Sequence, residues 1–254
     1  MIRFENVSKS FRPKSGPPSQ VLSDLNLTVG RGEFLCVLGP SGCGKITLLN
    51  LAAGFLFPSE GRVLFERTQV RGPGPERGVV FQDATLFPWL TVLKNVEFGL
   101  KLQGLKGPPL IETARGHLER MGLADHADKY PHALSGGMRQ KVAIARVLAL
   151  APKVLLMDEP FSALDANSRK RLQDELLRMI RRRTVLYITH SVEEAAYLAD
   201  RIVILGNGAS NIFAALPNRQ KHPRNRSSAG FHAMQRRLRN ALGAQPCAVK
   251  PINP

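Results

Sequence analysis

Hydrophobic and polar residues alternate along the first thirty positions of the chain. In VLSDLNLTV, residues 21–29, most apolar side chains stand at every second position. A period of two is typical of a β-strand that buries one face. Residues 1–29 are therefore predicted to form short strands.

Three short runs are apolar throughout: FLCVL at 34–38, VLLM at 154–157 and VLYI at 185–188. Runs of this length without alternation predict strands that are buried on both faces, as in a parallel sheet covered by helices. TLLNLAAGF, residues 47–55, follows the first run and predicts a helix, and the amphipathic stretch RLQDELLRMIRR, residues 171–182, lies between the other two. This order of strands and helices predicts an α/β fold.

The middle of the chain, residues 88–135, changes to a helical period. VLKNVEFGLKL, residues 92–102, and IETARGHLERMGL, residues 111–123, repeat apolar positions every three or four residues. GLKGPP, residues 104–109, separates them with glycine and proline, which break helices. We expect a helical subdomain inserted into the α/β core.

The end of the chain, residues 209–254, loses this periodicity. PNRQKHPRNRSS is loop-like, FHAMQRRLRNAL at 231–242 predicts one amphipathic helix, and GAQPCAVKPINP at 243–254 has the composition of a disordered segment. The predicted organisation is a globular unit over residues 1–208, followed by a partly disordered C-terminal tail.

Positive charge is concentrated in this tail. The formal net charge is +16, and nine of the 36 Lys and Arg residues, but none of the 20 Asp and Glu residues, lie from Arg201 onward. Such a tail can bind nucleic acid, lie against an anionic membrane surface or remain solvated. It lacks the interleaved aromatic residues that bind single-stranded nucleic acid, so we favour the last two interpretations and expect no nucleic-acid partner.

Composition excludes several classes of protein. A chain of 254 residues with 43% hydrophobic content can bury a substantial core. No stretch approaches the roughly 18 uninterrupted apolar residues of a membrane-spanning helix, and the start, MIRFENVSKSF, lacks the apolar run of a secretory signal. The three cysteines show no paired spacing that would indicate a disulfide framework or a zinc site. We expect the chain to remain in the cytosol.

The first candidate for chemistry is GPSGCGKITLL, residues 39–49, which follows a predicted buried strand and opens a predicted helix. In the pattern G-x-x-x-x-G-K-[ST], backbone N–H groups wrap a polyphosphate, the lysine reaches its β- and γ-phosphates, and the hydroxyl holds Mg²⁺. Gly39, Gly44 and Lys45 match this pattern, whereas Ile46 has no oxygen. The sequence predicts a phosphate-binding loop with a defect at its metal position.

Four further features follow along the chain. Asp158 and Glu159 end the apolar run of KVLLMDEP, where two acids can hold Mg²⁺ and polarise an attacking water, or can simply be solvated. LSGGM places Ser135 before two glycines and a predicted helix, an arrangement of N–H donors that suits an anion. Gln82 and His190 carry little weight alone. The joint occurrence of these features in this order favours nucleotide chemistry.

In this order the motifs resemble the ATP-binding subunit of an ABC transporter, over about residues 1–205. The resemblance rests on GPSGCGK, VVFQD, LSGGM, LLMDEP, SALD and ITH. It implies a P-loop NTPase (RecA-like) core of the α/β class, with an antiparallel β subdomain and an inserted α-helical subdomain. It also implies ATP and Mg²⁺ as cofactors, and a head-to-tail dimer in which ATP lies between the phosphate loop of one copy and the LSGGM signature of the other.

The resemblance assigns roles to individual residues. Glu159 would be the catalytic base, His190 would sense the γ-phosphate, and Gln82 would contact Mg²⁺ and the attacking water. Asp158 would support the metal, and Asp165 would link the two sites of the dimer. The nucleotide would contact Phe11, which would stack on adenine, the loop residues Gly39, Pro40, Ser41, Gly42, Cys43, Gly44, Lys45, Ile46 and Thr47, and the partner's signature residues, which are Ser135, Gly136 and Gly137.

Two longer stretches, PGPERGVVFQDATLFPWLTVLKNVEFGL and LSGGMRQKVAIARVLA, resemble importer subunits for nitrate, taurine and alkanesulfonates. In such systems the cassette lies peripherally at the cytoplasmic face of the inner membrane. It pairs with transmembrane permease subunits, and a periplasmic solute-binding protein acts indirectly. Phe87, Pro88 and Trp89 follow Gln82 and form an apolar patch that would suit a permease helix. The sequence does not select one solute.

Ile46 departs from the family, in which Ser or Thr binds Mg²⁺ at this position. Thr47 does not replace it, because one helical position turns the side chain by about 100°. Three explanations stay open: a recent change or sequence error, a partnership with an intact sibling cassette, and Mg²⁺ binding through water. Since the loop keeps its N–H groups and Lys45, hydrolysis should suffer more than binding. A milder departure is Ser191 after His190, where relatives often have Asp.

The leading prediction is an ATPase that energises solute import. One rival is a non-hydrolysing, ATP-dependent dimerising or regulatory module, which Ile46 favours and the intact Glu159 and His190 oppose. The other is a soluble ABC ATPase that acts on nucleic acid. The net charge favours this second rival, but the helical segment between Gln82 and Ser135 is too short for the long coiled coil of such proteins.

Overall fold

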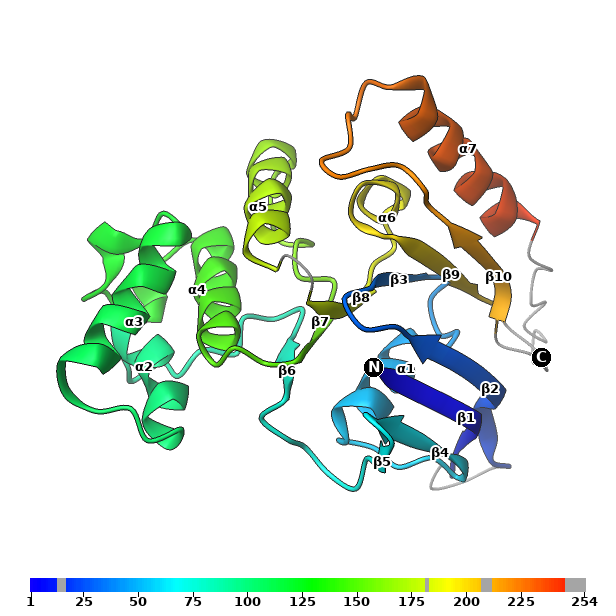
Figure 1. Ribbon diagram of the computed structural model, residues 1–254, viewed down its shortest axis with the longest axis horizontal. Coiled ribbons are helices and arrows are strands. Elements are labelled where there is room, and N and C mark those ends of the chain that lie inside the picture. The colour runs from blue at the N-terminus through cyan, green and yellow to red at the C-terminus, as the bar shows by residue number, and fades with distance from the viewer. Residues whose placement is uncertain (13–16, 181–182, 207–211, 245–254) are drawn as a thin grey trace, which may run out of the picture. The chain divides into compact units, whose positions relative to one another are not determined.

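The computed structural model describes residues 1–12, 17–180, 183–206 and 212–244. The chain divides into two compact units (Figure 1). The first unit combines Met1–Pro73 with Thr184–Pro254, and the second is Gly74–Arg183. Because the second unit interrupts the first, the two parts of the first unit are far apart in the sequence.

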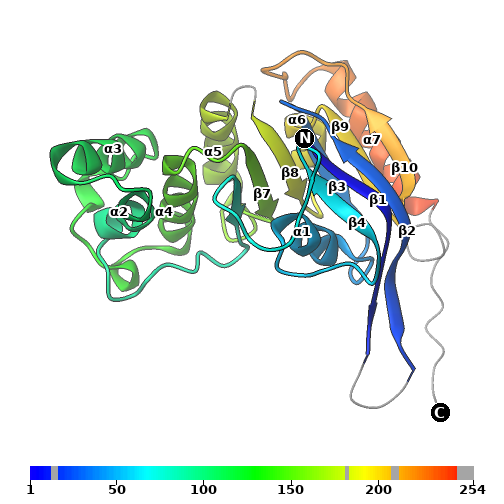
Figure 2. The same cartoon turned by 60° about the horizontal axis from the view of Figure 1, so that its bottom comes forward.

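An antiparallel sheet forms the N-terminal part of the first unit, with strand order β2-β1-β4-β5. Its strands are β1 (Ile2–Phe11), β2 (Ser19–Val29), β4 (Glu60–Phe65) and β5 (Thr68–Gln69). The alternating side chains of β1 and β2 send Phe4, Leu25 and Leu27 into the core. Figure 2 shows the long β1–β2 pair. The strands predicted for residues 1–29 are confirmed.

The second sheet region of this unit has the order β10-β9-β3-β8. Its strands are β3 (Phe34–Leu38), β8 (Thr184–Ile188), β9 (Arg201–Leu205) and β10 (Ile212–Pro217). β3 runs parallel to both β8 and β9, and every residue of β3 and β8 is buried. The apolar runs without alternation thus form buried parallel strands, as predicted.

The helices of the first unit are α1 (Lys45–Ala53), α6 (Val192–Leu198) and α7 (Ala229–Gly243). α7 packs against α6, with the rings of Phe231 and Tyr197 6.4 Å apart in an edge-on arrangement. The helix predicted at 231–242 begins two residues earlier, because the Ser228 hydroxyl caps it by accepting a hydrogen bond from the Phe231 N–H.

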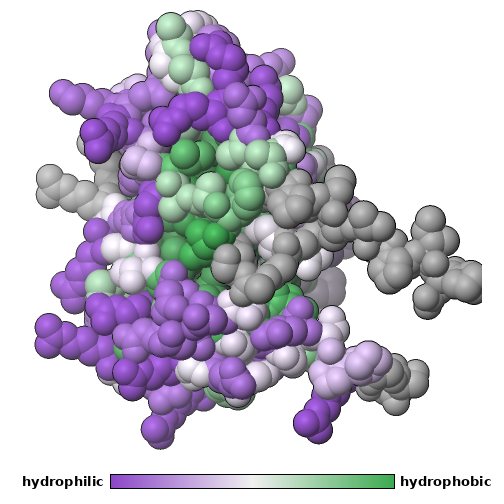
Figure 3. All heavy atoms as spheres, turned by 90° about the vertical axis from the view of Figure 1, so that its right-hand side faces the viewer, coloured by the Kyte–Doolittle hydropathy of each residue, from purple (hydrophilic) through white to green (hydrophobic). Residues whose placement is uncertain are grey.

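β10 lies in the segment that was expected to have no regular structure before its helix. Its sequence, IFAALP, carries no charge, and it pairs antiparallel with β9 at the edge of the sheet. The molecular face on this side shows hydrophobic residues between hydrophilic ones (Figure 3), and Phe213 of β10 is 40% exposed. A six-residue strand depends on its long-range pairing with β9, which local periodicity does not reveal. Most of the predicted disordered end, from residue 245 onward, lies outside the described residues.

The second unit holds a parallel pair of strands and four helices. β6 (Arg77–Val80) pairs with β7 (Val154–Asp158), whose residues are all buried. The helices are α2 (Val92–Leu102), α3 (Gly107–Arg120), α4 (Gly136–Ala149) and α5 (Ala166–Met179), with short 3₁₀ turns η1 (Ala124–His126) and η2 (Pro131–Ala133). α2, α3 and α4 pack on one another. The helical character predicted for the middle segment is confirmed.

α3 begins earlier than its hydrophobic period indicates. GLKGPP was expected to separate two helices, but Gly107, Pro108 and Pro109 already belong to α3. Proline is tolerated in the first turn of a helix because the N–H that it lacks would have no intrahelical acceptor. The break is therefore shorter than predicted.

Asp200 ties the C-terminal segment to the start of β3. Its Oδ2 accepts a hydrogen bond from the Phe34 N–H at 2.9 Å, and its Oδ1 lies 3.2 Å from His222 Nε2 and 3.7 Å from Arg224 Nη2. The buried Arg224 also donates to the Tyr197 carbonyl at 2.6 Å. Burial alone would raise the pKa of Asp200. The hydrogen bonds and the two cationic side chains outweigh burial and hold this pKa below its ordinary value.

This electrostatic arrangement predicts a pH-dependent contribution of Asp200 to stability. Because the pKa is lower in the folded state, the contribution is complete above the unfolded pKa of about 3.9 and disappears as the pH falls through the folded pKa. We expect the native chain to exceed Asp200→Asn in free energy of urea unfolding near pH 6, and the difference to shrink steadily between about pH 5 and pH 3. The exposed Asp128→Asn serves as the control, and a pH-independent difference for Asp200→Asn would contradict the assignment.

Candidate functional site

The phosphate loop, residues 39–45, leaves the end of the buried strand β3 and enters α1. Gly44 stands immediately before α1 with φ 98°, and a Cβ there would lie 2.8 Å from Leu22 Cδ2. A Cβ at Gly39 would lie 2.5 Å from the Leu205 carbonyl oxygen. Both positions therefore require glycine, and the chain turns as the sequence pattern predicts.

Lys45 lies across this loop. Its Nζ donates to the carbonyl oxygens of Gly39 at 2.8 Å and Pro40 at 2.7 Å, and it lies 3.9 Å from Cys43 Sγ. Burial raises the pKa of the Cys43 thiol, although the charge of Lys45 opposes this effect. These two carbonyl oxygens hold the ammonium beside the loop when no anion is bound. Polyphosphate oxygens would take their place around Nζ.

The start of α1 offers N–H groups to an anion. The Leu48 N–H makes the first hydrogen bond within the helix, to the Gly44 carbonyl at 2.8 Å. Among the described residues, the N–H groups of residues 45–47 have no acceptor, and no acidic residue stands in the first turn. Open N–H groups at a helix N-terminus attract phosphate. The loop therefore fits the triphosphate of ATP.

The same loop does not fit Mg²⁺ at its usual position. Ile46 is the second residue of α1, and its apolar side chain is 55% exposed. Mg²⁺ takes near-octahedral oxygen ligands, and isoleucine has none to give. No group of three or more His, Cys, Asp and Glu residues in the described ranges is arranged to hold a metal ion.

His190 follows the strand next to β3. Val37 of β3 pairs with Ile188 of β8 in parallel register, so the loops that follow both strands start side by side. His190 is exposed, as a side chain that contacts a ligand must be. Phe11, the predicted adenine contact, is the last residue of β1 in the same unit and is 39% exposed. Lys9 Nζ lies over its ring, 5.2 Å from the ring centre.

A buried network fixes the turn that carries His190. Thr189 Oγ1 donates to Glu194 Oε2 at 2.6 Å and accepts from the Ser191 N–H at 3.0 Å, and the Tyr187 hydroxyl donates to the same carboxylate oxygen at 2.8 Å. The Ser191 hydroxyl caps α6 by accepting from the Glu194 N–H. Serine and aspartate are both good caps, which explains why this departure from the family is mild.

Thr189→Val keeps the shape of the side chain but removes both hydrogen bonds of its hydroxyl. The buried Glu194 and the Ser191 N–H would each lose a partner, so we expect the free energy of unfolding to fall by about 1–3 kcal/mol in urea titrations at constant m-value. Thr68→Val, at an exposed position of β5, is the matched control. Equal stabilities for the two variants would show that the network does not hold this turn.

The second unit carries the two acids at the end of β7. Asp158 is buried to 9% exposure, whereas Glu159 is partly exposed and has a φ of 41°. A non-glycine residue in the left-handed region costs on the order of 1–3 kcal/mol, and such residues are enriched at functional sites and in tight turns. The two carboxyl groups thus differ in environment, one inside the unit and one at its surface.

The LSGGM signature forms the start of α4 in the same unit. The Ser135 hydroxyl caps the helix by accepting from the Met138 N–H at 3.3 Å, and Gly136 and Gly137 form its first turn. A Cβ at Gly137 would lie 2.5 Å from Leu164 Cδ2, so glycine permits the close packing of this turn on the SALD loop.

The next residue of the SALD loop, Asp165, caps α5. Its Oδ1 accepts hydrogen bonds from the N–H groups of Asn167 and Ser168, each at 3.0 Å. Hydrogen bonds from Ser168 lower the pKa of Asp165.

Gln82 lies exposed in the loop after β6, and α4 anchors this loop on both sides of it. The buried Gln140 donates to the Phe81 carbonyl at 3.0 Å, and Arg146 donates to the Thr85 carbonyl at 3.1 Å. These supporting residues were not identified from the sequence. Both lie on α4 beyond the signature, and six residues separate them, a spacing that does not mark a common helix face and gave no signal in the sequence.

The apolar patch after Gln82 is built on one buried side chain. Asn95, which is fully buried, accepts from the Phe87 N–H and donates to the carbonyls of Phe87, Leu90 and Thr91. Trp89 is 70% exposed, and its ring centre lies 5.6 Å from that of Phe87. The turn is thus rigid while its aromatic surface is open to solvent.

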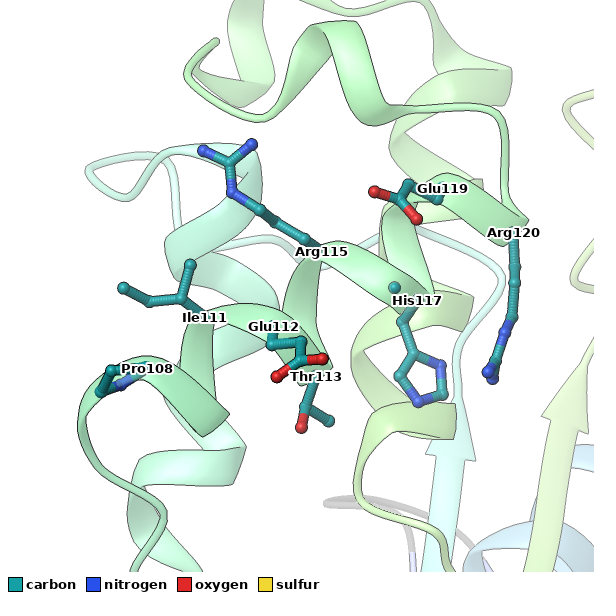
Figure 4. A pocket seen from close by; sticks show the side chains of 9 residues that line it. Pro108, Ile111, Glu112, Thr113, Arg115, His117, Glu119 and Arg120 are labelled. Carbon is teal, nitrogen blue, oxygen red and sulfur yellow. The ribbon is translucent and has the colours of Figure 1, made fainter.

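A surface cavity of about 910 Å³ lies elsewhere, along α3 (Figure 4). Its lining runs from Pro108 to Arg120, and none of the predicted site residues belongs to it. At its far end, burial and the charges of Arg120 and Arg183 lower the pKa of His117. The cavity is therefore distinct from the phosphate loop.

Comparison with known families gives one clear match. The family model for ABC transporters matches residues 22–162, which include the phosphate loop, the signature and the acids. The chain belongs to the ABC transporter family. Its predicted identity as the ATP-binding ATPase subunit of a transporter is confirmed.

Curated relatives cover nearly the whole cassette. MJ0412 of Methanocaldococcus jannaschii, described as an uncharacterized ABC transporter ATP-binding protein, is 47% identical over 95% of this chain and 91% of its own length. Two proteins of Synechocystis sp. follow. The nitrate import ATP-binding protein NrtD is 46% identical over 89% of this chain and 87% of its own length. The bicarbonate transport ATP-binding protein CmpD is 45% identical over 94% of this chain and 86% of its own length.

Solved structures confirm the predicted ABC cassette fold. The dimeric structure of MJ0796, described as a bacterial ABC transporter cassette, matches with a TM-score of 0.79 and 31% identity, over 87% of this chain and all of that chain. A post-hydrolysis dimer of the same protein with ADP and Pi has a TM-score of 0.78. None of the helices in the described part of the cassette is long and apolar enough to cross a membrane.

Proposed function

We propose that this cassette is the ATPase subunit of an importer for a small anion, of the kind represented by nitrate and bicarbonate. The similarity to NrtD and CmpD, at 46% and 45% identity over most of the chain, carries the proposal. Alkanesulfonates and the zwitterion taurine, suggested by the two longer stretches in the sequence, remain candidate solutes beside these anions. The nearly equal identities to NrtD and CmpD do not separate the two anions.

The cassette would work as a head-to-tail dimer at the cytoplasmic face of the membrane. The dimeric structures of MJ0796 support a dimer. Its permease partners would contact the patch of Phe87, Pro88 and Trp89, where the aromatic surface is open and the turn beneath it is rigid. A periplasmic solute-binding protein would deliver the solute to the permease and would not contact this chain.

The phosphate loop, Phe11 and the partner's Ser135, Gly136 and Gly137 would bind ATP. Glu159, with its partly exposed carboxylate, would act as the base toward the attacking water, and Gln82 and His190 would position that water and the γ-phosphate. Asp158 and Gln82 remain the proposed metal ligands, but Ile46 leaves the phosphate loop without a metal ligand of its own. We therefore propose slow hydrolysis.

Ile46→Thr tests this step. If misplacement of the metal removes about 3–5 kcal/mol of transition-state stabilisation, the purified Thr variant should hydrolyse ATP roughly 10²–10⁴ times faster than the native chain. Ile46→Val has the shape of threonine without its oxygen and should show no such gain. Equal rates for the native chain and the Thr variant would mean that the native chain is an ordinary working ATPase.

An experiment that identifies the solute needs the complete transporter. Proteoliposomes that contain the cassette, its permease and its solute-binding protein should take up nitrate or bicarbonate in an ATP-dependent manner, with taurine and an alkanesulfonate tested in parallel. Uptake of none of these solutes by an assembled complex would contradict the importer proposal.

The second candidate is a non-hydrolysing, ATP-dependent dimerising or regulatory module. The exposed apolar side chain of Ile46 at the metal position favours it. It predicts ATP-dependent dimers, detectable by light scattering, in which the Thr variant still fails to hydrolyse ATP. Rapid hydrolysis by Ile46→Thr would instead favour the importer motor.

A further inference from the structure

Ile46 contributes little to the packing of the protein. Its neighbours Leu48 and Leu49 in α1 are almost completely buried, whereas 55% of the Ile46 side chain is exposed. An exposed isoleucine in the first turn of a helix that follows a phosphate loop has no core to fill. Its effect should therefore fall on the ligand of the loop and not on the fold.

The groups that remain in the loop bind anions. The N–H groups of residues 45–47, which have no acceptor among the described residues, and the ammonium of Lys45 would interact with phosphate oxygens directly. Their attraction increases with the negative charge of the nucleotide. None of them coordinates a cation.

Two hydroxyl groups lie near the missing one in the sequence, but neither replaces it. Thr47 is one helical position further on, which turns its side chain by about 100°, and it is half-buried. Ser41 is exposed in the loop, before Gly44 and outside α1. The position from which a helix side chain would reach the metal holds only carbon.

Mg²⁺ bound to ATP would therefore change the interaction in two unfavourable ways. The ion neutralises part of the triphosphate charge that the loop attracts. It also keeps water ligands that dehydrate reluctantly, and these would face the apolar side chain of Ile46. In an intact loop, the hydroxyl ligand offsets both effects.

We propose that Mg²⁺ does not strengthen ATP binding to this chain, so that the phosphate loop holds the metal-free triphosphate at least as tightly as its Mg²⁺ complex. The inference rests on the proposed ATP site and concerns its selectivity. It separates two properties that are normally combined in a phosphate loop, which are affinity for the anion and affinity for the metal that accompanies it.

The experiment is a calorimetric titration of the full chain with ATP at matched ionic strength, once with excess Mg²⁺ and once with excess EDTA. The native chain and Ile46→Val should bind ATP in Mg²⁺ no more than about threefold more tightly than in EDTA, or more weakly. Ile46→Thr should bind at least about tenfold more tightly in Mg²⁺. Coincident urea unfolding curves for the three proteins would show that the exposed substitution leaves the fold unchanged.

Each other result has a definite meaning. If Mg²⁺ tightens ATP binding tenfold in the native chain, the inference is overturned. Water, a loop hydroxyl or the proposed ligands Asp158 and Gln82 would then hold the metal well enough, and the ATP site would stand. If Mg²⁺ has no effect on the Thr variant either, residue 46 does not set the metal preference and the inference is again overturned. Failure of the native chain to bind ATP in both conditions would overturn the proposed function as well.

Discussion

The burial of β3 is the constraint on which the phosphate loop depends. All five residues of this strand are buried, and its parallel neighbours β8 and β9 hold it on both sides. Gly39 then leaves the strand so close to the Leu205 carbonyl that a Cβ would not fit. The loop is consequently held by the interior of the sheet, at the carboxyl ends of parallel strands, where α/β proteins bind their ligands. His190 follows the neighbouring strand and shares this placement.

The sequence predicts well those elements whose buried residues follow a hydrophobic pattern within the element itself. The strands around Phe4 and Leu35 and the helix of residues 92–102 follow from periods of two, from continuous apolar runs and from a helical period. The first turn of α3 was missed because proline breaks a helix in its interior but not at its start. β10 was missed because only its pairing with β9 marks it as a strand.

The candidate site likewise contains residues that a local motif reveals and residues that only long-range contacts reveal. The loop, the signature and the paired acids are short contiguous motifs, so their residues were recognised directly. The residues that hold them are distant in sequence and ordinary in type. Glu194 lies under the His190 turn, Gln140 anchors the loop of Gln82, and Asn95 braces the aromatic turn. A buried polar side chain must find partners, and only the fold shows which ones it finds.

Ile46 shows how far the two functions of a phosphate loop can be separated. The proposed affinity for the triphosphate would come from the N–H groups of α1 and from Lys45, which a change of side chain at residue 46 leaves in place. The contribution of the loop itself to binding the metal would come from one hydroxyl, which a single substitution removes. The backbone part is protected by the packing of Gly39 and Gly44 against Leu205 and Leu22, whereas the exposed side chain is free to change without cost to the fold. Loss of the metal ligand at this exposed position should therefore change the chemistry of the nucleotide site with little effect on the stability of the fold.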